Sequence, residues 1–417
     1  MPNLGDTGSI VLGLVLVTVA GTLNGSWNVS FRPSHGFAVR RLSSNVATEE
    51  PCIDLEHHQA WILFQIYAVL LNVPVCLWWA GGPQNVADIV QSSQAADILL
   101  IVIFSLLWGV GSVGFGLACR VAGVGLGTNL CMGIIMVLGT FLPLCLEGAI
   151  ATAAGGLVVA GLVLCCGGLA LGVQSLQARD GKISKLAITD DDEASTKDVR
   201  APGVGSSDLQ HESIGMMKET LVQLDSTKNP PTSDVLPLTA NEPEYSTAYK
   251  VAVCVIAGIF ATQLQFAFVF GQGMIDYAED LDGTPSSGSS AVIWLFAITL
   301  GAPSSILFGA FGKPAHIPWS HLYQCPWYRH FLIVATTSAP WVCHIHLYGF
   351  CTTLLPDDMA ASVAWPILMM ATVISGILWS IILGEWKDAC AKAKRRLYQG
   401  LAVVTAGVFV IMSSVSL

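Results

Sequence analysis

The sequence predicts an all-α membrane protein with ten transmembrane helices, arranged as two inverted five-helix repeats. Ten apolar stretches, most of roughly 20 residues, are each long enough to cross a hydrocarbon core about 30 Å thick as a helix. The chain is 53% apolar and only 12% charged, whereas a soluble domain carries about 25% charged residues. Both observations indicate an integral membrane protein.

The predicted spans follow one another along the chain, and the longest connection comes after the fifth. They lie near residues 9–30, 59–80, 98–117, 124–146, 150–175, 249–271, 290–311, 328–353, 361–384 and 398–415. Small residues recur inside them at four-residue spacing, as at Gly21 and Gly25. This spacing predicts close packing of helix backbones.

The charged residues predict the orientation of these spans. All 19 Lys and Arg residues lie in or beside odd-numbered connections, whereas even-numbered connections carry carboxylates such as Asp97, Asp276 and Asp357. Basic loops stay on the cytoplasmic side of a bilayer. We therefore expect cytoplasmic odd-numbered loops, non-cytoplasmic termini, and a plasma or bacterial inner membrane rather than an organelle membrane.

Residues 177–247 differ from the rest of the chain. They contain an acidic run from Asp190 to Glu193, many Ser and Thr residues and little apolar content. This composition predicts a disordered cytoplasmic linker, where phosphorylation could control regulatory partners. The linker separates a first five-helix repeat, residues 1–176, from a second, residues 248–417. Because five is odd, the second repeat enters the membrane inverted, a geometry that places a substrate site near the midplane.

The end of the first span carries a candidate sugar-binding face. Asn24, Trp27 and Asn28 share one helix face because positions i, i+3 and i+4 align. An indole can stack on the C–H face of a sugar while amides bind its hydroxyls. Alternatively, the two asparagines cross-link helices.

The eighth span carries a second such face, formed by Trp341, His344 and Tyr348. Histidine titrates near neutral pH and is a common proton relay, and a charged imidazole is costly when dehydrated. We therefore expect His344 to contact substrate or couple protons, the alternative being a buried, hydrogen-bonded histidine. His346 should point elsewhere, and no third ligand accompanies the two histidines to make a metal site.

Further polar residues lie inside the spans. Trp108 and Gln265 are expected at the site, and Gln65, Asn72 and Ser112 either bind hydroxyls or satisfy neighbouring helices. Glu147 and Glu385 are additional proton-coupling candidates. They lie at span ends, however, where charge costs less than at the membrane centre and solvated or ion-paired roles are the default.

Several classes of function are disfavoured. The sequence lacks the zinc-protease, nucleophile-elbow and phosphate-loop motifs and has no G-x-G-x-x-G after a strand, so an enzyme is not expected. A net charge of −10 argues against nucleic acid. Most of the 12 cysteines lie within apolar spans and are expected to pack as small hydrophobes. We expect no cofactor and no metal, with the proton as coupling ion.

One family resemblance covers most of the chain outside residues 177–247. Its clearest stretch comprises Trp108-Gly109-Val110-Gly111, Gly116-Leu117, Arg120, Gly123, Gly127, Gly133, Gly139-Thr140 and Pro143. Weaker matches are Phe31-Arg32, Glu56, Trp61, Gly258-Ile259-Phe260, Phe266-Ala267, Trp341, Tyr348, Trp365 and Glu385-Trp386. With these residues the chain resembles the L-rhamnose–proton symporter family of the drug/metabolite transporter superfamily.

The resemblance implies a ten-helix carrier that moves a deoxysugar or related small polyol together with protons. The chain departs from the family pattern among the expected substrate contacts. His344 stands where the family has Gln, Ser112 and Gly114 stand where it has Asn, and Arg32-Pro33 replaces a basic pair. These departures concern the identity of the substrate rather than the fold.

The leading hypothesis is a secondary active transporter of a small sugar, coupled to protons through alternating access. A nucleotide-sugar or other metabolite exchanger is an alternative, but a diphosphate would require Lys or Arg within the spans. A membrane scaffold regulated through its linker is another alternative. A cavity on which polar side chains converge would favour transport, and a sealed apolar interior would favour the scaffold.

Overall fold

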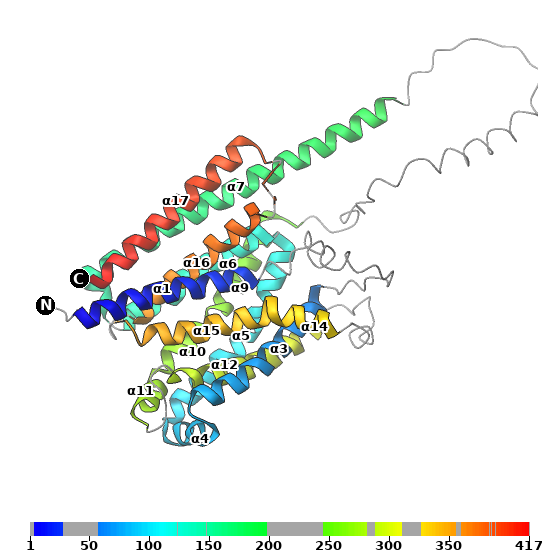
Figure 1. Cartoon of the computed structure of the whole chain (residues 1–417). Coiled ribbons are helices and arrows are strands. Elements are labelled where there is room, and N and C mark those ends of the chain that lie inside the picture. The colour runs from blue at the N-terminus through cyan, green and yellow to red at the C-terminus, as the bar shows by residue number, and fades with distance from the viewer. Residues whose placement is uncertain are drawn as a thin grey trace, which may run out of the picture. The chain divides into compact units, whose positions relative to one another are not determined.

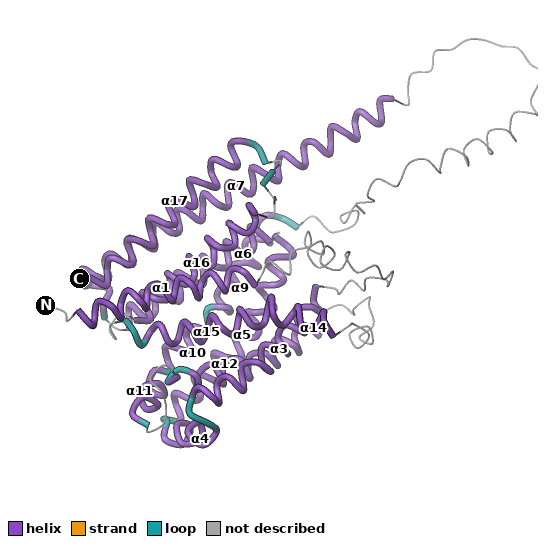
Figure 2. Tube along the Cα trace, viewed as in Figure 1, coloured by secondary structure: helices purple, strands orange, loops and turns teal. Residues whose placement is uncertain are grey.

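The computed structural model contains only helices and their connections in the residues that it describes (Figures 1 and 2). These are residues 4–27, 57–122, 124–146, 148–197, 245–281, 288–310, 327–355, 360–382, 384, 386–387 and 389–416. Residues 1–180 and 247–417 together form one compact unit, and residues 181–246 form a second. The first unit carries the membrane helices.

The helices of the first half are α1 (Leu4–Trp27), α3 (His57–Trp79), α4 (Pro83–Ser92), α5 (Ala95–Ala122), α6 (Val124–Leu146) and α7 (Ala153–Lys197). Those of the second half are α9 (Thr247–Ala261), α10 (Gln263–Phe270), α11 (Gln272–Asp280), α12 (Ala291–Ala310), α14 (Trp327–Ile333), α15 (Ala339–Thr352), α16 (Ala360–Ile382) and α17 (Ala391–Ser413). Short 3-10 turns occupy Ala149–Ala151 and Ser414–Ser416.

Eight helical stretches within the described residues are long and apolar enough to cross a membrane. They are Thr7–Ser26, Trp61–Trp79, Ala95–Cys119, Gly127–Leu146, Ala153–Arg179, Ala248–Asp280, Ala361–Ile382 and Ala391–Ser413. The predicted all-α membrane fold is confirmed at this level, whereas the count of ten is not. Of the other two predicted spans, 290–311 coincides with α12, whose apolar part Ala291–Leu307 is shorter.

The predicted span 328–353 is not a single regular helix. A π-helical segment, Val334–Ser338, separates α14 from α15. Pro340 follows in the first turn of α15, where a residue without an N–H is tolerated. Such π segments frequently occur at functional sites, and this one immediately precedes Trp341 and His344.

Helix α7 continues beyond the predicted end of its span to Lys197, into the segment for which we expect disorder. Residues 180–197 include Ala, Leu, Lys and Glu, which have good helix propensity in water as well as in lipid. The predicted division at residues 176 and 247 remains a prediction.

Glycines set the distances between helices in the bundle. Helix α5 packs against α6, α9, α10 and α12, and α1 packs against α15 and α16. A Cβ on Gly21 would overlap the Leu368 carbonyl, and one on Gly25 would overlap the Thr372 carbonyl of α16. Helices α7 and α17 lie side by side (Figure 1), with Gly168 against the Gly400 carbonyl. The predicted close packing at Gly21 and Gly25 is therefore present.

Candidate functional site

A cavity lies inside the bundle between helices of both halves of the chain. A volume of about 80 Å³ within it can hold the centre of a water-sized molecule. Its lining comprises Asn24, Trp61, Phe64, Gln65, Trp108, Ser112, Phe115, Met132, Ile135, Ala261, Leu264, Trp341, His344, Trp365 and Met369. These residues come from α1, α3, α5, α6, α9, α10, α15 and α16.

Four of the predicted substrate-binding residues line this cavity: Asn24, Trp108, Trp341 and His344. Two others, Gln265 and Tyr348, are buried but lie outside the lining and bind each other. The side chain of Trp27 and all of Asn28, Glu147 and Glu385 lie outside the described residues. The structure thus brings four of the predicted residues to one cavity and places Gln265 and Tyr348 outside its lining.

Aromatic rings form much of the cavity wall. The indoles of Trp108 and Trp341 stack with centroids 5.6 Å apart and an interplanar angle of 13°. Phe64 meets Trp341 edge-on at 5.5 Å. Because these rings come from α5, α15 and α3, the stack joins the two halves of the chain at the cavity.

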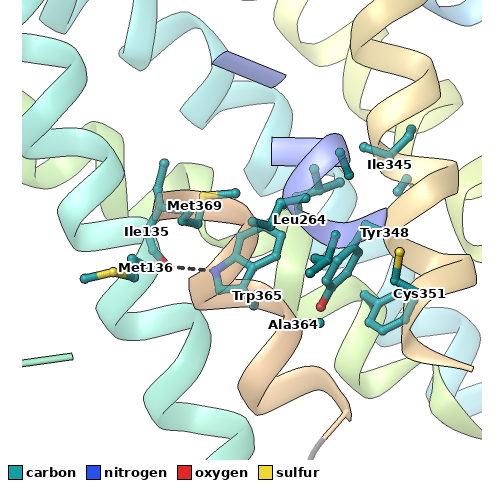
Figure 3. Close-up of a cluster of buried hydrophobic side chains, with 14 of the residues drawn as sticks. Ile135, Met136, Leu264, Ile345, Tyr348, Cys351, Ala364, Trp365 and Met369 are labelled. Carbon is teal, nitrogen blue, oxygen red and sulfur yellow. Dashed lines mark hydrogen bonds between the residues drawn. The ribbon is translucent and has the colours of Figure 1, made fainter. Parts of the chain in front are cut away.

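Two indoles of the wall have their N–H groups already occupied. Trp61 Nε1 donates to Ser305 Oγ at 3.3 Å, and Trp365 Nε1 donates to the Ile135 carbonyl at 3.1 Å. Figure 3 shows the second bond, with Trp365 between Ile135 on one side and Tyr348 on the other. These two tryptophans can therefore offer a ligand ring surface but no free hydrogen-bond donor.

Asn24 lines the cavity and also joins two helices. Its Nδ2 donates to Thr372 Oγ1 at 3.1 Å, connecting α1 to α16. Asn24 therefore cross-links two helices, as the alternative interpretation expects, and also lines the cavity.

His344 and His346 have different surroundings, as predicted. His344 is 4% exposed, lines the cavity and meets the Trp341 ring edge-on at 5.6 Å. Its Nδ1 is buried and makes no hydrogen bond of normal geometry. His344 is therefore a buried histidine at the cavity wall, with its Nδ1 unpaired.

His346, two residues further on, is a buried, hydrogen-bonded histidine. Its Nε2 lies 3.0 Å from Asn72 Oδ1 and 3.7 Å from Cys76 Sγ, and its ring stacks on Trp79. Asn72 Nδ2 in turn donates to the Trp294 carbonyl at 3.0 Å. His346 therefore belongs to a network joining α3, α12 and α15. Across the described part of the chain, no group of three His, Cys, Asp or Glu residues is placed to hold a metal ion.

The second span contributes more residues to the cavity lining than the sequence pattern predicted. Gln65, from α3, lines the cavity and donates through Nε2 to Ser112 Oγ of α5 at 2.9 Å. Trp61 and Phe64 line it from the same helix. The available signal was an amide inside an apolar helix, but periodicity along one helix does not say which face meets a cavity.

The lining contains no Asp, Glu, Lys or Arg side chain among its described residues, and His344 is its only titratable group. A low-dielectric cavity without a counter-charge disfavours charged ligands. The site is therefore suited to an uncharged molecule with one apolar face and some hydroxyl groups.

The apolar helices and this aromatic and polar cavity are features of a multi-pass, all-helical membrane protein. A protein of Mannheimia succiniciproducens named L-rhamnose-proton symporter is 22% identical over 334 residues, which cover 74% of this chain and 76% of the relative. The chain is homologous to proteins of this name, so the resemblance seen in the sequence is confirmed.

Two further relatives with the same name match shorter stretches. The protein of Cronobacter sakazakii is 28% identical over 94 residues, covering 22% of this chain and 27% of the relative. That of Yersinia pestis is 32% identical over 57 residues, covering 14% and 17%. All three are named as transporters, in agreement with the prediction that this chain is not an enzyme. No protein-family model and no solved structure matches the chain.

Proposed function

We propose that the protein is a secondary active transporter that carries a small neutral sugar, a rhamnose-like deoxysugar or related monosaccharide, together with protons. The observation that carries this proposal is an uncharged, aromatic-walled cavity, between helices of both halves of the chain, in a homologue of L-rhamnose-proton symporters. Indole faces suit the C–H face of a sugar, and buried polar groups suit its hydroxyls.

Transport is proposed to proceed by alternating access between two inverted five-helix halves, with ten spans in all. The packing of the helices supports this arrangement, because contacts in one half have counterparts in the other. Helix α1 packs against α15 and α16, and its counterpart α9 packs against α5 and α6. Likewise α5 meets α6, and α15 meets α16. In an inverted repeat, each of these contacts in one half corresponds to a contact in the other half.

The proposed orientation follows the basic residues, with odd-numbered loops in the cytoplasm, both termini outside and the protein in a plasma or bacterial inner membrane. Residues 177–247 are proposed as a cytoplasmic linker between the halves. Regulatory partners there remain a hypothesis based on its Ser, Thr and acidic composition.

His344 is proposed as the coupling group, because it is the titratable residue of the lining. Its protonation would change as access alternates, since a charged imidazole is stabilised where water reaches it and is costly where water is excluded. Glu147 and Glu385 remain secondary candidates for coupling.

The alternative functions fit the cavity less well. A nucleotide-sugar diphosphate lacks a cationic partner in the described lining, and a scaffold gives no reason for this cavity.

The proposal can be tested by reconstituting the protein in liposomes and measuring uptake of radiolabelled L-rhamnose and a panel of monosaccharides. A proton gradient, acidic on the substrate side, should drive accumulation of at least one sugar, and a protonophore should abolish that accumulation. Liposomes without protein provide the background. Absence of uptake of every sugar by folded protein in both orientations would refute the proposal.

A further inference from the structure

The amide of Gln65 is half satisfied, although it lies in the interior of a membrane bundle. The side chain is fully buried, and Nε2 donates to Ser112 Oγ at 2.9 Å. The carbonyl oxygen Oε1 has no hydrogen-bond partner. Buried carbonyls are normally paired because an unpaired one loses its bonds to water without replacement. The unpaired Oε1 therefore requires an explanation.

Helix packing does not provide that explanation. Hydroxyls elsewhere in the bundle bond within their own helix, as Ser105 does to the Ile101 carbonyl and Thr372 to the Leu368 carbonyl. Ser112 could be satisfied in the same way without an amide from α3. The bond to Ser112 instead holds one end of the Gln65 side chain in place and leaves its other polar atom available.

The position of Gln65 connects this unpaired oxygen to the cavity. Gln65 lines the cavity together with His344, whose Nδ1 is likewise buried and unpaired. Neighbouring polar groups of the wall are engaged, since Asn24 donates to Thr372 and Trp61 donates to Ser305. Gln65 Oε1 and His344 Nδ1 are thus the buried lining atoms, among the described residues, that are left for a ligand.

The chemistry of Oε1 defines the group that it binds. A carbonyl oxygen accepts, so the ligand must donate. An ammonium group would have no carboxylate nearby to replace its water, whereas a hydroxyl needs none. We propose that Gln65, positioned by Ser112, is a specificity-determining residue that accepts a hydrogen bond from one substrate hydroxyl. This inference rests on the proposed sugar transport and deepens it.

One consequence separates Gln65 from a merely structural glutamine. A site built to bond a hydroxyl discriminates strongly against the analogue that lacks it, because the protein group is then left buried and unpaired. Wild-type protein should therefore disfavour one particular monodeoxy analogue of its sugar, while the apolar variant Gln65→Leu should lose that discrimination.

The test uses proteoliposomes and the sugar with the greatest uptake, with L-rhamnose first, beside its set of monodeoxy analogues. For one analogue, wild-type KM should exceed that of the parent sugar roughly tenfold or more. In Gln65→Leu this ratio should fall to about one, with KM of the parent sugar raised and KM of that analogue nearly unchanged. The ratios for the other analogues should stay as in wild type.

Gln263→Leu is the matched control, because Gln263 is an amide of the same bundle that bonds the Ile259 carbonyl and does not line the cavity. It should retain the wild-type ratios. If Gln65→Leu folds but transports slowly, quenching of tryptophan fluorescence by the same sugars measures binding instead of transport. If Gln65→Leu does not fold, Gln65→Asn replaces it in the test. The asparagine, being shorter, should also lose the discrimination.

The outcomes separate this inference from the proposed function. If wild-type protein neither transports nor binds any sugar, the proposed function fails and this inference fails with it. If wild-type protein transports sugar but Gln65→Leu changes KM equally for every analogue, or for none, only the role of Gln65 is overturned.

Discussion

Gln265 and Tyr348 satisfy each other in the wall behind the cavity. Gln265 Nε2 lies 2.8 Å from the Tyr348 hydroxyl, and this hydroxyl lies 3.0 Å from Gln265 Oε1. Tyr348 is also packed against Phe268, Trp294 and Trp365 (Figure 3 shows the last pair). Two residues expected to bind substrate thus form a structural link between α10 and α15.

The first prediction concerns this pair. Gln265→Leu should lower the free energy of unfolding by about 1–3 kcal/mol, because it removes the hydrogen bonds between Gln265 and the buried Tyr348 hydroxyl. The double variant Gln265→Leu/Tyr348→Phe should be less destabilised than the sum of the two single variants, since it removes both polar groups. Thermal unfolding in detergent measures this. Additive losses would show that the hydrogen bond contributes no coupling.

His344→Gln should remove the pH dependence of transport while sparing binding. Wild-type accumulation should rise as the substrate side becomes more acidic, because His344 must gain a proton there to carry it across. The glutamine variant should bind sugar with similar affinity but show a flat pH profile and no protonophore sensitivity. Uptake at a series of pH values measures the change.

His346→Gln is the matched control for this experiment. His346 lies two residues away and bonds Asn72 rather than lining the cavity, and a glutamine amide can still donate to Asn72 Oδ1. The control should keep the wild-type pH slope. If proton-driven accumulation survives His344→Gln unaltered, the coupling role belongs elsewhere, with Glu147 and Glu385 the next residues to replace.

Trp341→Ala should weaken sugar binding roughly tenfold, the scale expected when an aromatic ring is removed from a buried site. The substitution takes away both a part of the cavity surface and the ring that stacks on Trp108 at 5.6 Å. Trp341→Phe should weaken binding less because it retains an aromatic face. Equilibrium binding of radiolabelled sugar distinguishes the two variants, and equal affinity for both would contradict a stacking role.

Gly109→Ala should destabilise the bundle by about 1–3 kcal/mol, the usual cost of overpacking a close contact. A Cβ there would overlap Ser304 Oγ and the Gly301 carbonyl, which lie on α12. Gly116→Ala is the control on the same helix, since its Cβ would have nothing within 4 Å. Comparing the unfolding temperatures of the two variants tests this, and equal values would contradict it.

Asn72→Leu should reduce stability more than a change at a lipid-facing position does. It would remove the hydrogen bonds that Asn72 makes with the His346 ring nitrogen and with the Trp294 carbonyl, at a cost of about 0.5–1.5 kcal/mol each. Leu70→Ala on the same helix is a suitable comparison, because Leu70 is 62% exposed in the bundle. Unfolding in detergent should rank the two variants in this order.

The eighth span shows what helical periodicity predicts and what it leaves open. Its periodicity placed Trp341, His344 and Tyr348 on one face and turned His346 away. That rotation is correct for the two histidines, but Tyr348 lies one turn beyond the end of the cavity lining and meets Gln265 instead. Periodicity fixes direction around a helix axis, whereas the depth of a cavity along that axis depends on neighbouring helices.

The second span contains two amides that the sequence does not distinguish but the structure does. Its amides Gln65 and Asn72 look equivalent in the sequence, since both interrupt one apolar helix. In the structure, Gln65 lines the cavity and Asn72 closes a hydrogen-bond network with His346. Nothing local to α3 distinguishes them, because the difference is made by the residues of α5, α12 and α15 that face each amide.

The sequence by itself determined that this chain is a multi-pass, all-helical membrane protein and a homologue of sugar–proton symporters. Low charge and stretches of span length settle that class, because a bilayer permits only helices or closed barrels to cross it. The tertiary structure decided which polar side chains share a cavity. Contacts such as Gly109 against α12 and Gly25 against α16 set how closely the helices approach, and those distances determine which buried groups find partners and which, like Gln65 Oε1, do not.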